Sequence, residues 1–233
     1  MADKVCAVVG AGPGNGRAFA AKFHTAGYRV ALLARNAESL ARIREAVPDT
    51  HCFPCDVSIE SQIESAFAAI HQKLGTVDTL IYNAGAGKFG SIDEVSAADF
   101  EQAWRVNALG CFLSVQQVLP RMRAQGSGNI IIIGATASRK GGARFAAFAS
   151  AKAAQRNLAQ SMARLLGPEG IHVSYAIIDG VIDLQRTRQM LPGKPDEFFM
   201  NPAHIADTIF HLSQQHRSTW SFEVDLRPFG ETW

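Results

Sequence analysis

The chain has 233 residues, of which 47% are hydrophobic and 19% are charged. Its formal net charge is +2, and lysine and arginine are spread along the chain instead of forming the basic block of a nucleic-acid-binding protein. The N-terminus shows no apolar secretion segment, and the longest apolar run, residues 130–135, is too short to span a membrane. These features predict a single cytoplasmic domain, residues 1–233, that binds neither nucleic acid nor membrane.

Two periodicities alternate along the chain. Short apolar runs typical of strands buried on both faces cover residues 4–10, 28–34, 51–55, 77–83, 128–134, 171–178 and 220–226. Helical patterns cover residues 15–26, 36–47, 59–74, 95–125, 145–166 and 201–215. Gly167-Pro168 is expected to end one helix, and Asn201-Pro202 to cap and open another. The alternation predicts an α/β domain of Rossmann type, a doubly wound parallel sheet of seven strands with helices on both faces.

Residues 183–200 are the least regular part of the sequence, and in this architecture we expect such a segment to lie over the ligand crevice. Two other groupings resemble metal or redox sites. Cys52 and Cys55 stand at the end of a short strand, whereas a redox pair belongs at a helix N-terminus. His204, Asp207 and His211 share one helical face, which we interpret as an exposed polar face. We therefore predict no metal site.

A glycine-rich turn follows the first strand and precedes the first helix. In "VVGAGPGNGRAFA", Gly10, Gly14 and Gly16 allow the backbone to turn tightly and to approach a pyrophosphate, whose charge the amides of the helix N-terminus would meet. The sequence therefore predicts a dinucleotide site that includes Gly10, Gly14, Asn15 and Gly16.

The end of the second strand indicates which dinucleotide binds. A carboxylate about 20 residues beyond the glycines would hold the ribose hydroxyls of NAD, whereas an arginine there accommodates the extra phosphate of NADP. This chain has Ala34 and then Arg35, with no acid before Glu38. Arg35 also fits a solvated residue at a strand end. The missing acid favours NADP(H) over NAD(H).

Together these motifs resemble the short-chain dehydrogenase/reductase family over essentially the whole chain. The glycine spacing matches the family's glycine motif, although Val9 stands where a threonine is usual. By resemblance, further cofactor contacts and structural positions are Asp56 and Val57 beside the adenine, and Asn83, Ala84 and Gly85 after the fourth strand.

The resemblance also identifies active-site residues. Asn107 matches an asparagine that holds a water and steadies a helix kink. Lys152 matches a lysine that binds the nicotinamide-ribose hydroxyls and lowers the pKa of a catalytic tyrosine. That tyrosine should stand at Phe148, and the catalytic serine at Ala135. Asp179 takes the place of the proline in the family's Pro-Gly pair after the sixth strand.

The loss of two hydroxyls bears on the reaction. A positioned general acid contributes roughly 10² to 10⁴ in rate, so we expect ordinary ketone reduction to be severely impaired. Tyr175 lies in a buried strand, and Ser150 should point away from Phe148 around the helix. Thr136 and Ser138 are either substitute donors or hydroxyls of a turn.

Two functional classes remain open at this point. The chain is a reductase whose substrate needs no protein hydroxyl, such as an iminium ion, or a conjugated alkene that takes its proton from water or from a relay through Asn107 and Lys152. Alternatively, it is a catalytically silent NADP(H)-binding subunit or nucleotide sensor. The retained Asn107 and Lys152 favour the enzyme, although Lys152 fits both classes because it also binds ribose.

The substrate side and the assembly give two further expectations. Cationic and apolar side chains near the crevice could together form a pocket for a small anionic substrate, or they could belong to ordinary solvated loops. The residues are Arg139, Lys140, Arg144, Arg186 and Arg188, with Phe145, Met190, Phe198 and Phe199. The family resemblance implies a homodimer or homotetramer built on helices 95–125 and 145–166, and their apolar content agrees with it.

Overall fold

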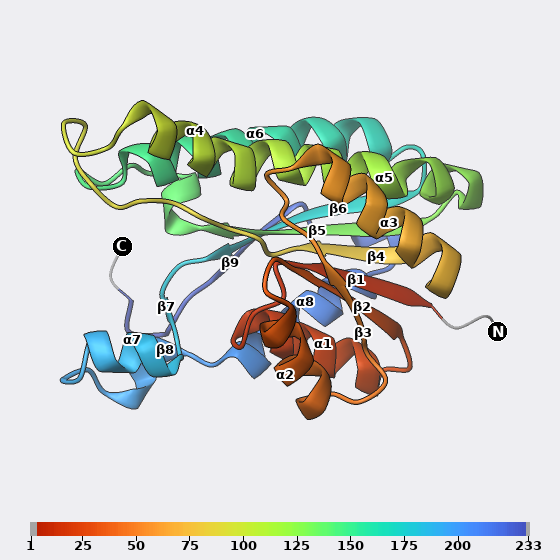
Figure 1. Ribbon diagram of the computed structural model, residues 1–233, viewed down its shortest axis with the longest axis horizontal. Helices are drawn as coiled ribbons and strands as arrows, with labels where there is room; N and C mark the ends of the chain where they lie inside the picture. The colour runs from red at the N-terminus through yellow and green to blue at the C-terminus, as the bar shows by residue number, and fades with distance from the viewer. Residues whose placement is uncertain (1–3, 232–233) are drawn as a thin grey trace.

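The computed structural model describes residues 4–231 and shows one parallel sheet between two helical layers (Figure 1). The sheet order is β3–β2–β1–β4–β5–β6–β9, and each neighbouring pair is parallel. The strands are β1 (Val5–Val9), β2 (Arg29–Ala34), β3 (His51–Pro54), β4 (Val77–Tyr82), β5 (Gly128–Ala135), β6 (Ile171–Ile178) and β9 (Glu223–Leu226). The doubly wound seven-stranded α/β fold predicted from the sequence is confirmed.

The helices cover both faces of the sheet, as Figure 1 shows. On one face lie α1 (Asn15–Thr25), α2 (Ala37–Ala46) and α8 (Pro202–Ser213); on the other lie α3 (Glu60–Leu74), α5 (Gly110–Gln125) and α6 (Ala146–Leu166). A further helix, α4 (Ala97–Trp104), packs its Ala103 against Ala147 and Ala151 of α6. No helix in the described part of the chain is long and apolar enough to cross a membrane.

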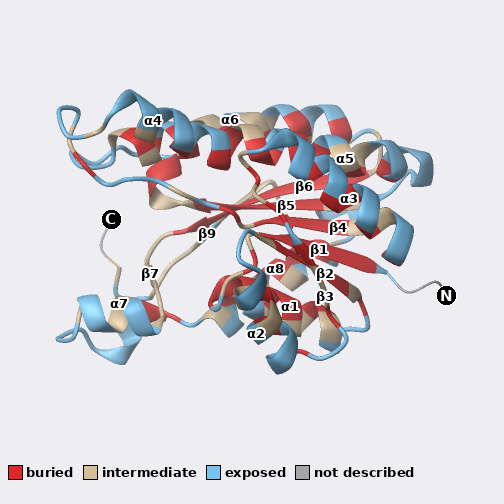
Figure 2. Ribbon diagram, in the orientation of Figure 1, coloured by how far each residue is buried: buried red, intermediate tan, exposed pale blue. Residues whose placement is uncertain are grey.

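The continuous apolar runs of the strands follow from burial on both sides. In β4, Leu80 and Tyr82 belong to the core beneath α3, α5 and α6, whereas Ile81 belongs to the core beneath α1, α2 and α8. All residues of β1 and β6 are buried, and Figure 2 shows the central strands in the colour of buried residues. Both faces of these strands are covered by helices, so the alternating pattern of a half-exposed strand is absent.

The expected helix 95–125 is interrupted. Ser96 caps α4 by accepting a hydrogen bond from the backbone amide of Asp99, and a π-helical turn (Arg105–Leu109) separates α4 from α5. The other helices lie within about two residues of their expected bounds. At the start of α8, the side chain of Asn201 accepts a hydrogen bond from Ala203 N, and Pro202 occupies the first turn, as predicted.

The segment 183–200 is more regular than its composition indicated. It contains a short helix, α7 (Gln185–Met190), and a strand, β8 (Phe199–Met200), that pairs with β7 (Val181–Ile182) outside the main sheet. Figure 1 shows this small unit projecting beyond the end of the sheet, joined to β6 on one side and to α8 on the other.

Candidate active site

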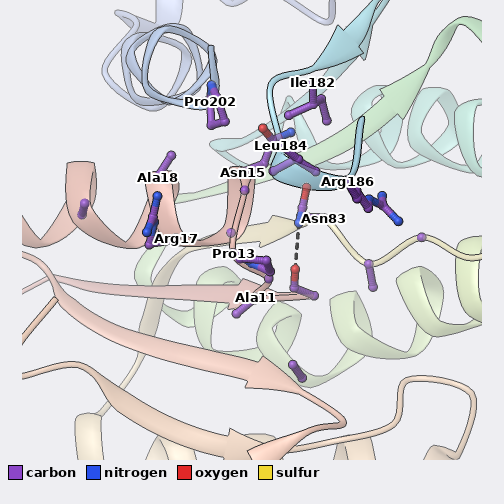
Figure 3. Close-up of a pocket in the computed structure, with 18 of the residues that line it drawn as sticks. Ala11, Pro13, Asn15, Arg17, Ala18, Asn83, Ile182, Leu184, Arg186 and Pro202 are labelled. Carbon is purple, nitrogen blue, oxygen red and sulfur yellow. Dashed lines mark hydrogen bonds between the residues drawn. The ribbon is translucent and has the colours of Figure 1, made fainter. Parts of the chain in front are cut away.

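A cavity of about 1300 Å³ opens beside the glycine-rich turn. Its walls come from the segments after β1, β2, β3 and β4, together with β7, α7 and the start of α8 (Figure 3). The predicted cofactor residues that line it are Gly10, Gly14, Asn15, Gly16, Arg35, Asp56, Val57, Asn83, Ala84 and Gly85. Lys152 is not part of the wall. Residues 182–186 are, so the expectation that the late segment lies over the crevice is confirmed.

The turn after β1 is braced by the segment after β4. Gly10 has a φ of +83°, and a Cβ on it would lie 2.4 Å from the backbone N of Ala84. Asn83 Nδ2 donates a hydrogen bond of 2.8 Å to the carbonyl of Gly10, drawn as the dashed line in Figure 3. These contacts explain why glycine stands at position 10 and why an amide side chain stands at position 83.

The N-terminus of α1 faces the cavity without a side-chain cap. Gly14 is the N-cap residue, and no side chain bonds the first amides of the helix. Asn15 is 6% exposed, and its Oδ1 has no hydrogen-bond partner within the described residues. A helix start without a side-chain cap favours an anion, and a buried amide oxygen needs a donor. Both features fit a bound dinucleotide.

Three guanidinium groups line the cavity. The guanidinium groups of Arg17, Arg35 and Arg186 form no ion pair or hydrogen bond with other residues in the range 4–231. The cavity acid Asp183 is engaged by Arg188, at 2.7 Å. Asp56 accepts hydrogen bonds from the backbone and hydroxyl of its neighbour Ser58, which fix its carboxylate in the turn after β3. The cavity therefore carries excess positive charge and suits the phosphates of a dinucleotide.

Lys152 and Asn107 lie behind Gly85, which is part of the cavity wall. A Cβ on Gly85 would lie 3.4 Å from Asn107 Oδ1 and 3.8 Å from Lys152 Nζ. Asn107 lies in the π-helical turn, where its Nδ2 donates to the carbonyls of Ala86 and Ala103 at 2.5 and 2.8 Å. Its Oδ1 has no partner within the described chain. The structure thus brings together the two residues that sequence analysis assigned to the reaction, with Gly85 between them and the cavity.

The Lys152 ammonium is held inside the protein. The residue is 4% exposed, and Nζ donates to the carbonyl of Ile133 at 2.8 Å and to Oε1 of Gln155 at 3.0 Å. Burial lowers the pKa of Lys152 to about 8, against a smaller opposing effect of Cys111. At neutral pH the lysine is therefore mostly charged.

The side chains of Phe148 and Ala135 carry no hydroxyl. Phe148 precedes Lys152 by one turn of α6, is half-buried and lies edge-on to Phe89, with ring centroids 5.6 Å apart. A Cβ on Gly87 would lie 2.7 Å from the ring of Phe148, so this backbone crosses close above it. Ala135 is the last residue of β5 and is half-buried.

The hydroxyls closest in sequence to these positions are all engaged within the protein. Thr136 donates to the carboxylate of Asp179. The Ser138 hydroxyl accepts from the amide of Ala135 at 3.0 Å and is 2.7 Å from Tyr175 Oη, and Ser150 donates to the carbonyl of an earlier residue in α6 at 2.8 Å. Tyr175 is fully buried, and its burial raises its pKa well above the usual value. Thr136 and Ser138 lie in a 3₁₀ turn, in agreement with their interpretation as turn hydroxyls.

The expected cationic group at the crevice is largely neutralised. Three of its members form ion pairs: Arg139 with Asp225 at 2.5 Å, Arg144 with Glu94 at 2.8 Å, and Arg188 with Asp183 and Asp196. Asp225 and Glu94 are distant in the sequence from the arginines they pair with, so inspection of the loop alone gave too much free charge. Lys140 and Arg186 keep no ion-pair partner within residues 4–231, and Arg186 belongs to the cofactor cavity.

The apolar members of that group also separate. Phe145 contacts Phe89, with ring centroids 5.0 Å apart, whereas Phe198 and Phe199 pack on each other in the segment around β8. The guanidinium of Arg188 lies 4.2 Å from the ring centroid of Phe199. These contacts form two apolar clusters on different segments.

The remaining candidates for metal or redox chemistry have other positions. Cys52 lies in β3, and Cys55 lines the cavity with a pKa raised to about 11 by burial. Asp207 forms an ion pair of 2.6 Å with Lys22 of α1, on the exposed face of α8 that the sequence predicted. Across residues 4–231, no three His, Cys, Asp or Glu side chains gather as metal ligands would.

Sequence analysis missed Arg17 of the cavity wall and also Gln155 beside Lys152. Gln155, in α6, is fully buried, and it bonds Lys152 through Oε1 and the backbone carbonyl of Asn107 through Nε2, at 2.8 Å. Its spacing from Lys152, i to i+3, was a usable signal, because residues at this spacing share a helix face. In an alanine-rich helix, however, a glutamine also fits the solvent-facing side.

Comparison with known proteins agrees with this geometry. Residues 4–192 match the family model of the short chain dehydrogenases. The 2-(R)-hydroxypropyl-CoM dehydrogenase of Xanthobacter autotrophicus is 30% identical over 233 residues, with 91% of each chain covered.

Two solved structures are similar over almost the whole chain. A short-chain dehydrogenase from Rhodopseudomonas palustris superposes with a TM-score of 0.83 at 33% identity, covering 97% of this chain and 99% of its own. A metagenomic short-chain oxidoreductase in complex with NADP has a TM-score of 0.83 at 26% identity, with 98% of each chain covered. The chain therefore belongs to the short-chain dehydrogenase family and is an oxidoreductase of that type.

Proposed function

We propose that this oxidoreductase uses NADP(H) in preference to NAD(H) and acts on substrates that need no proton from a protein hydroxyl, with an iminium ion as the first class and an enone as the second. A nicotinamide dinucleotide supplies or accepts a hydride. The turn of Gly10, Gly14 and Gly16, the amides of α1 and the cavity arginines would hold its phosphates, and Lys152 would approach its ribose beside Gly85.

The preference for NADP(H) rests on the end of β2. Ala34 ends the strand, and Arg35 follows it on the cavity wall without an ion-pair partner in the described chain. A guanidinium binds the 2′-phosphate of NADP, whereas the ribose hydroxyls of NAD need a carboxylate at this place. Similar structures hold NADP in one case and NAD+ in another, so the preference rests on Arg35 and the missing acid.

Titration of the protein fluorescence with NADPH and with NADH tests the preference. We expect tighter binding of NADPH, and we expect Arg35→Asp to narrow or reverse the difference because it adds the carboxylate and removes the cation. Arg42→Asp, which makes the same charge change on the neighbouring helix α2, should leave the ratio of the two dissociation constants near that of the unmodified protein. Equal affinities, or tighter NADH binding, would refute the proposal.

The substrate class rests on one observation: the nearby hydroxyls are already bonded inside the protein. Phe148 and Ala135, at the positions we assign to the family's tyrosine and serine, have none to offer. Thr136 donates to Asp179, and Ser138 is shared between Ala135 N and Tyr175. A ketone that accepts a hydride becomes an alkoxide and needs a proton. A general acid usually raises the rate of such a step by roughly 10² to 10⁴, and this site would supply little of that rate enhancement.

An iminium carbon avoids this requirement. Its nitrogen is already protonated or alkylated, so addition of a hydride gives a neutral amine, and no proton has to move in that step. In an enone, the hydride adds to the β carbon, and the enolate formed takes its proton at the α carbon from water. In both cases the protein has to bind and orient the two reactants, which the cavity can do.

Deuteride transfer from 4-deuterated NADPH tests the reaction class. We expect deuterium in the products from cyclic iminium salts and enones, and turnover of matched ketones and aldehydes lower by roughly 10² or more. Transfer to ketones at rates equal to those of the iminium salts would mean that another acid operates. Absence of transfer to every acceptor in a protein that binds NADPH would favour a catalytically silent nucleotide-binding subunit.

A further inference from the structure

A buried polar network surrounds the Lys152 ammonium, and Gln155 is its centre. Gln155 is 0% exposed. Its Oε1 accepts from Lys152 Nζ at 3.0 Å and from Tyr175 Oη at 3.3 Å, while its Nε2 donates to the backbone carbonyl of Asn107 at 2.8 Å. One amide therefore connects α6, β6 and the π-helical turn.

Two of the three N–H donors of the lysine have partners inside the protein. An ammonium has three such donors, and Lys152 Nζ donates one hydrogen bond to the carbonyl of Ile133 and one to Oε1 of Gln155. The third N–H is available to a group beside Gly85, because a Cβ on Gly85 would lie 3.8 Å from Lys152 Nζ. Gly85 is part of the cavity wall. With two donors fixed, the long side chain has one orientation in which its third donor is available to a ligand.

The same contacts maintain the charge. An ammonium in an apolar interior is costly unless acceptors surround it. The ionisable groups that face Lys152 are Cys111 from α5 and Tyr175 from β6, and burial raises the pKa of both thiol and phenol, so both are neutral at pH 7. The neutral amide of Gln155 and the carbonyl of Ile133 are thus what stabilises the charge.

We infer that Gln155 is a positioning residue that holds the Lys152 ammonium charged and directed toward Gly85, and that anchors it to the π-helical turn through the Asn107 carbonyl. Gln155 touches neither the cavity nor a reacting atom; it acts through the lysine. The inference rests on the proposed site only in assigning a ligand to the third N–H. It is tested below without cofactor or substrate, so failure of the proposed reaction would leave it unaffected.

The test is the titration of Lys152 in protein labelled with ¹³C at lysine Cε, with Lys152→Met identifying the signal. We expect a midpoint near pH 8 in the unmodified protein, as burial sets it. Gln155→Met keeps the length and removes the acceptor, so the midpoint should fall. Gln155→Glu places a carboxylate against the ammonium, so the midpoint should rise by roughly 1 to 3 units.

The two opposite directions separate positioning from packing. A residue that only fills space would give no shift, or shifts of one sign in both variants, and either result would overturn the inference. Gln160→Met, at a partly exposed position of the same helix, is the matched control and should leave the midpoint unchanged.

A second measurement uses the unmodified protein and does not depend on the stability of a variant. The side-chain amide of Gln155 should show slow hydrogen exchange, and its ¹H–¹⁵N signals should move with the same midpoint as the Lys152 Cε signal. An amide that exchanges fast, or that does not respond while Lys152 titrates, would equally contradict the assignment.

Discussion

Phe148 presents the ring of a tyrosine without its hydroxyl, one helical turn before a buried lysine. Because both Phe148 and Ala135 are half-buried, a hydroxyl added to either side chain would not enter a closed core. The difference between this site and one that reduces ketones is, in our proposal, confined to these two oxygen atoms.

The double variant Phe148→Tyr with Ala135→Ser tests this at the level of single residues. We expect carbonyl reduction with NADPH to rise by roughly 10² or more, because the variant restores a general acid beside Lys152. Steady-state rates on a simple ketone would show it, with Phe145→Tyr as a control that adds a phenol to the neighbouring ring. A folded, NADPH-binding double variant without gain would show that the site has diverged by more than two hydroxyls.

The role of a residue could be predicted from the sequence wherever its sequence neighbours determine that role. Gly10 needs a positive φ and a close approach to Ala84, and the glycine spacing indicated it. Arg139 shows the opposite case, since its partner Asp225 is distant in the chain and no local pattern reveals an ion pair of that kind. Gln155 was missed for a related reason: apart from Lys152, its partners Tyr175 and Asn107 come from β6 and the π-helical turn.

At the level of elements, α7 connects the small β7–β8 unit to the cofactor cavity. Leu184 approaches the glycine turn, since a Cβ on Gly14 would lie 2.6 Å from its Cδ2. Thr187 Oγ1 accepts from Leu184 N at 3.0 Å and donates to the carbonyl of Ile182 at 2.6 Å, which fixes the start of the helix. This docking places Arg186 on the cavity wall.

We predict that Arg186→Gln weakens the binding of NADPH and of NADH by the same factor, about tenfold or more for a charge-assisted hydrogen bond. The reason is that α7 approaches the glycine turn, where the pyrophosphate common to both nucleotides would lie. Fluorescence titration with both nucleotides gives the two factors. Lys140→Gln, which removes a positive charge outside the cavity wall, is the control. Weaker binding of NADPH but not of NADH would instead indicate that Arg186 binds the 2′-phosphate.

Elements were predictable where their periodicity is long and clear. The seven strands of the sheet and the long helices fall within a few residues of their sequence assignments. The interruption of residues 95–125 by the π-helical turn, which carries Asn107, was expected only through the family resemblance, because one extra residue per turn barely alters the apolar pattern. The β7–β8 pair was missed because two-residue strands have no period to detect.

At the scale of the whole molecule, the outer surface of α4, α5 and α6 bears on how copies of the chain associate. Large apolar side chains are exposed there, namely Phe100 and Trp104 of α4, Phe112 of α5 and Leu165 of α6, at 41–59% of their full exposure. Figure 2 shows exposed residues along the outer sides of α4 and α5. An apolar surface of this kind favours association with a second copy of the chain.

We predict a homodimer or homotetramer built on these helices. Sedimentation at micromolar concentration should give a mass above that of one chain. Trp104→Glu together with Phe112→Glu should shift the mass toward the monomer, because charges would be buried in the contact. Phe229→Glu, at a side chain that is 91% exposed and outside these helices, should have no effect. A monomeric unmodified protein would contradict the prediction.

The sheet order also governs how the chain reaches its fold. Since every neighbouring pair is parallel, no two adjacent strands are joined by a hairpin, and Val5 of β1 must find Val77 of β4 across the intervening residues. Folding that depends on such distant pairings is slow, and apolar strands that are not yet paired are prone to aggregate with other chains. The interior strand β1 is synthesised first, but the edge of β1 that pairs with β4 stays unpaired until β4 has been made. The yield of active protein on refolding should therefore fall as its concentration rises, even where the native state is stable.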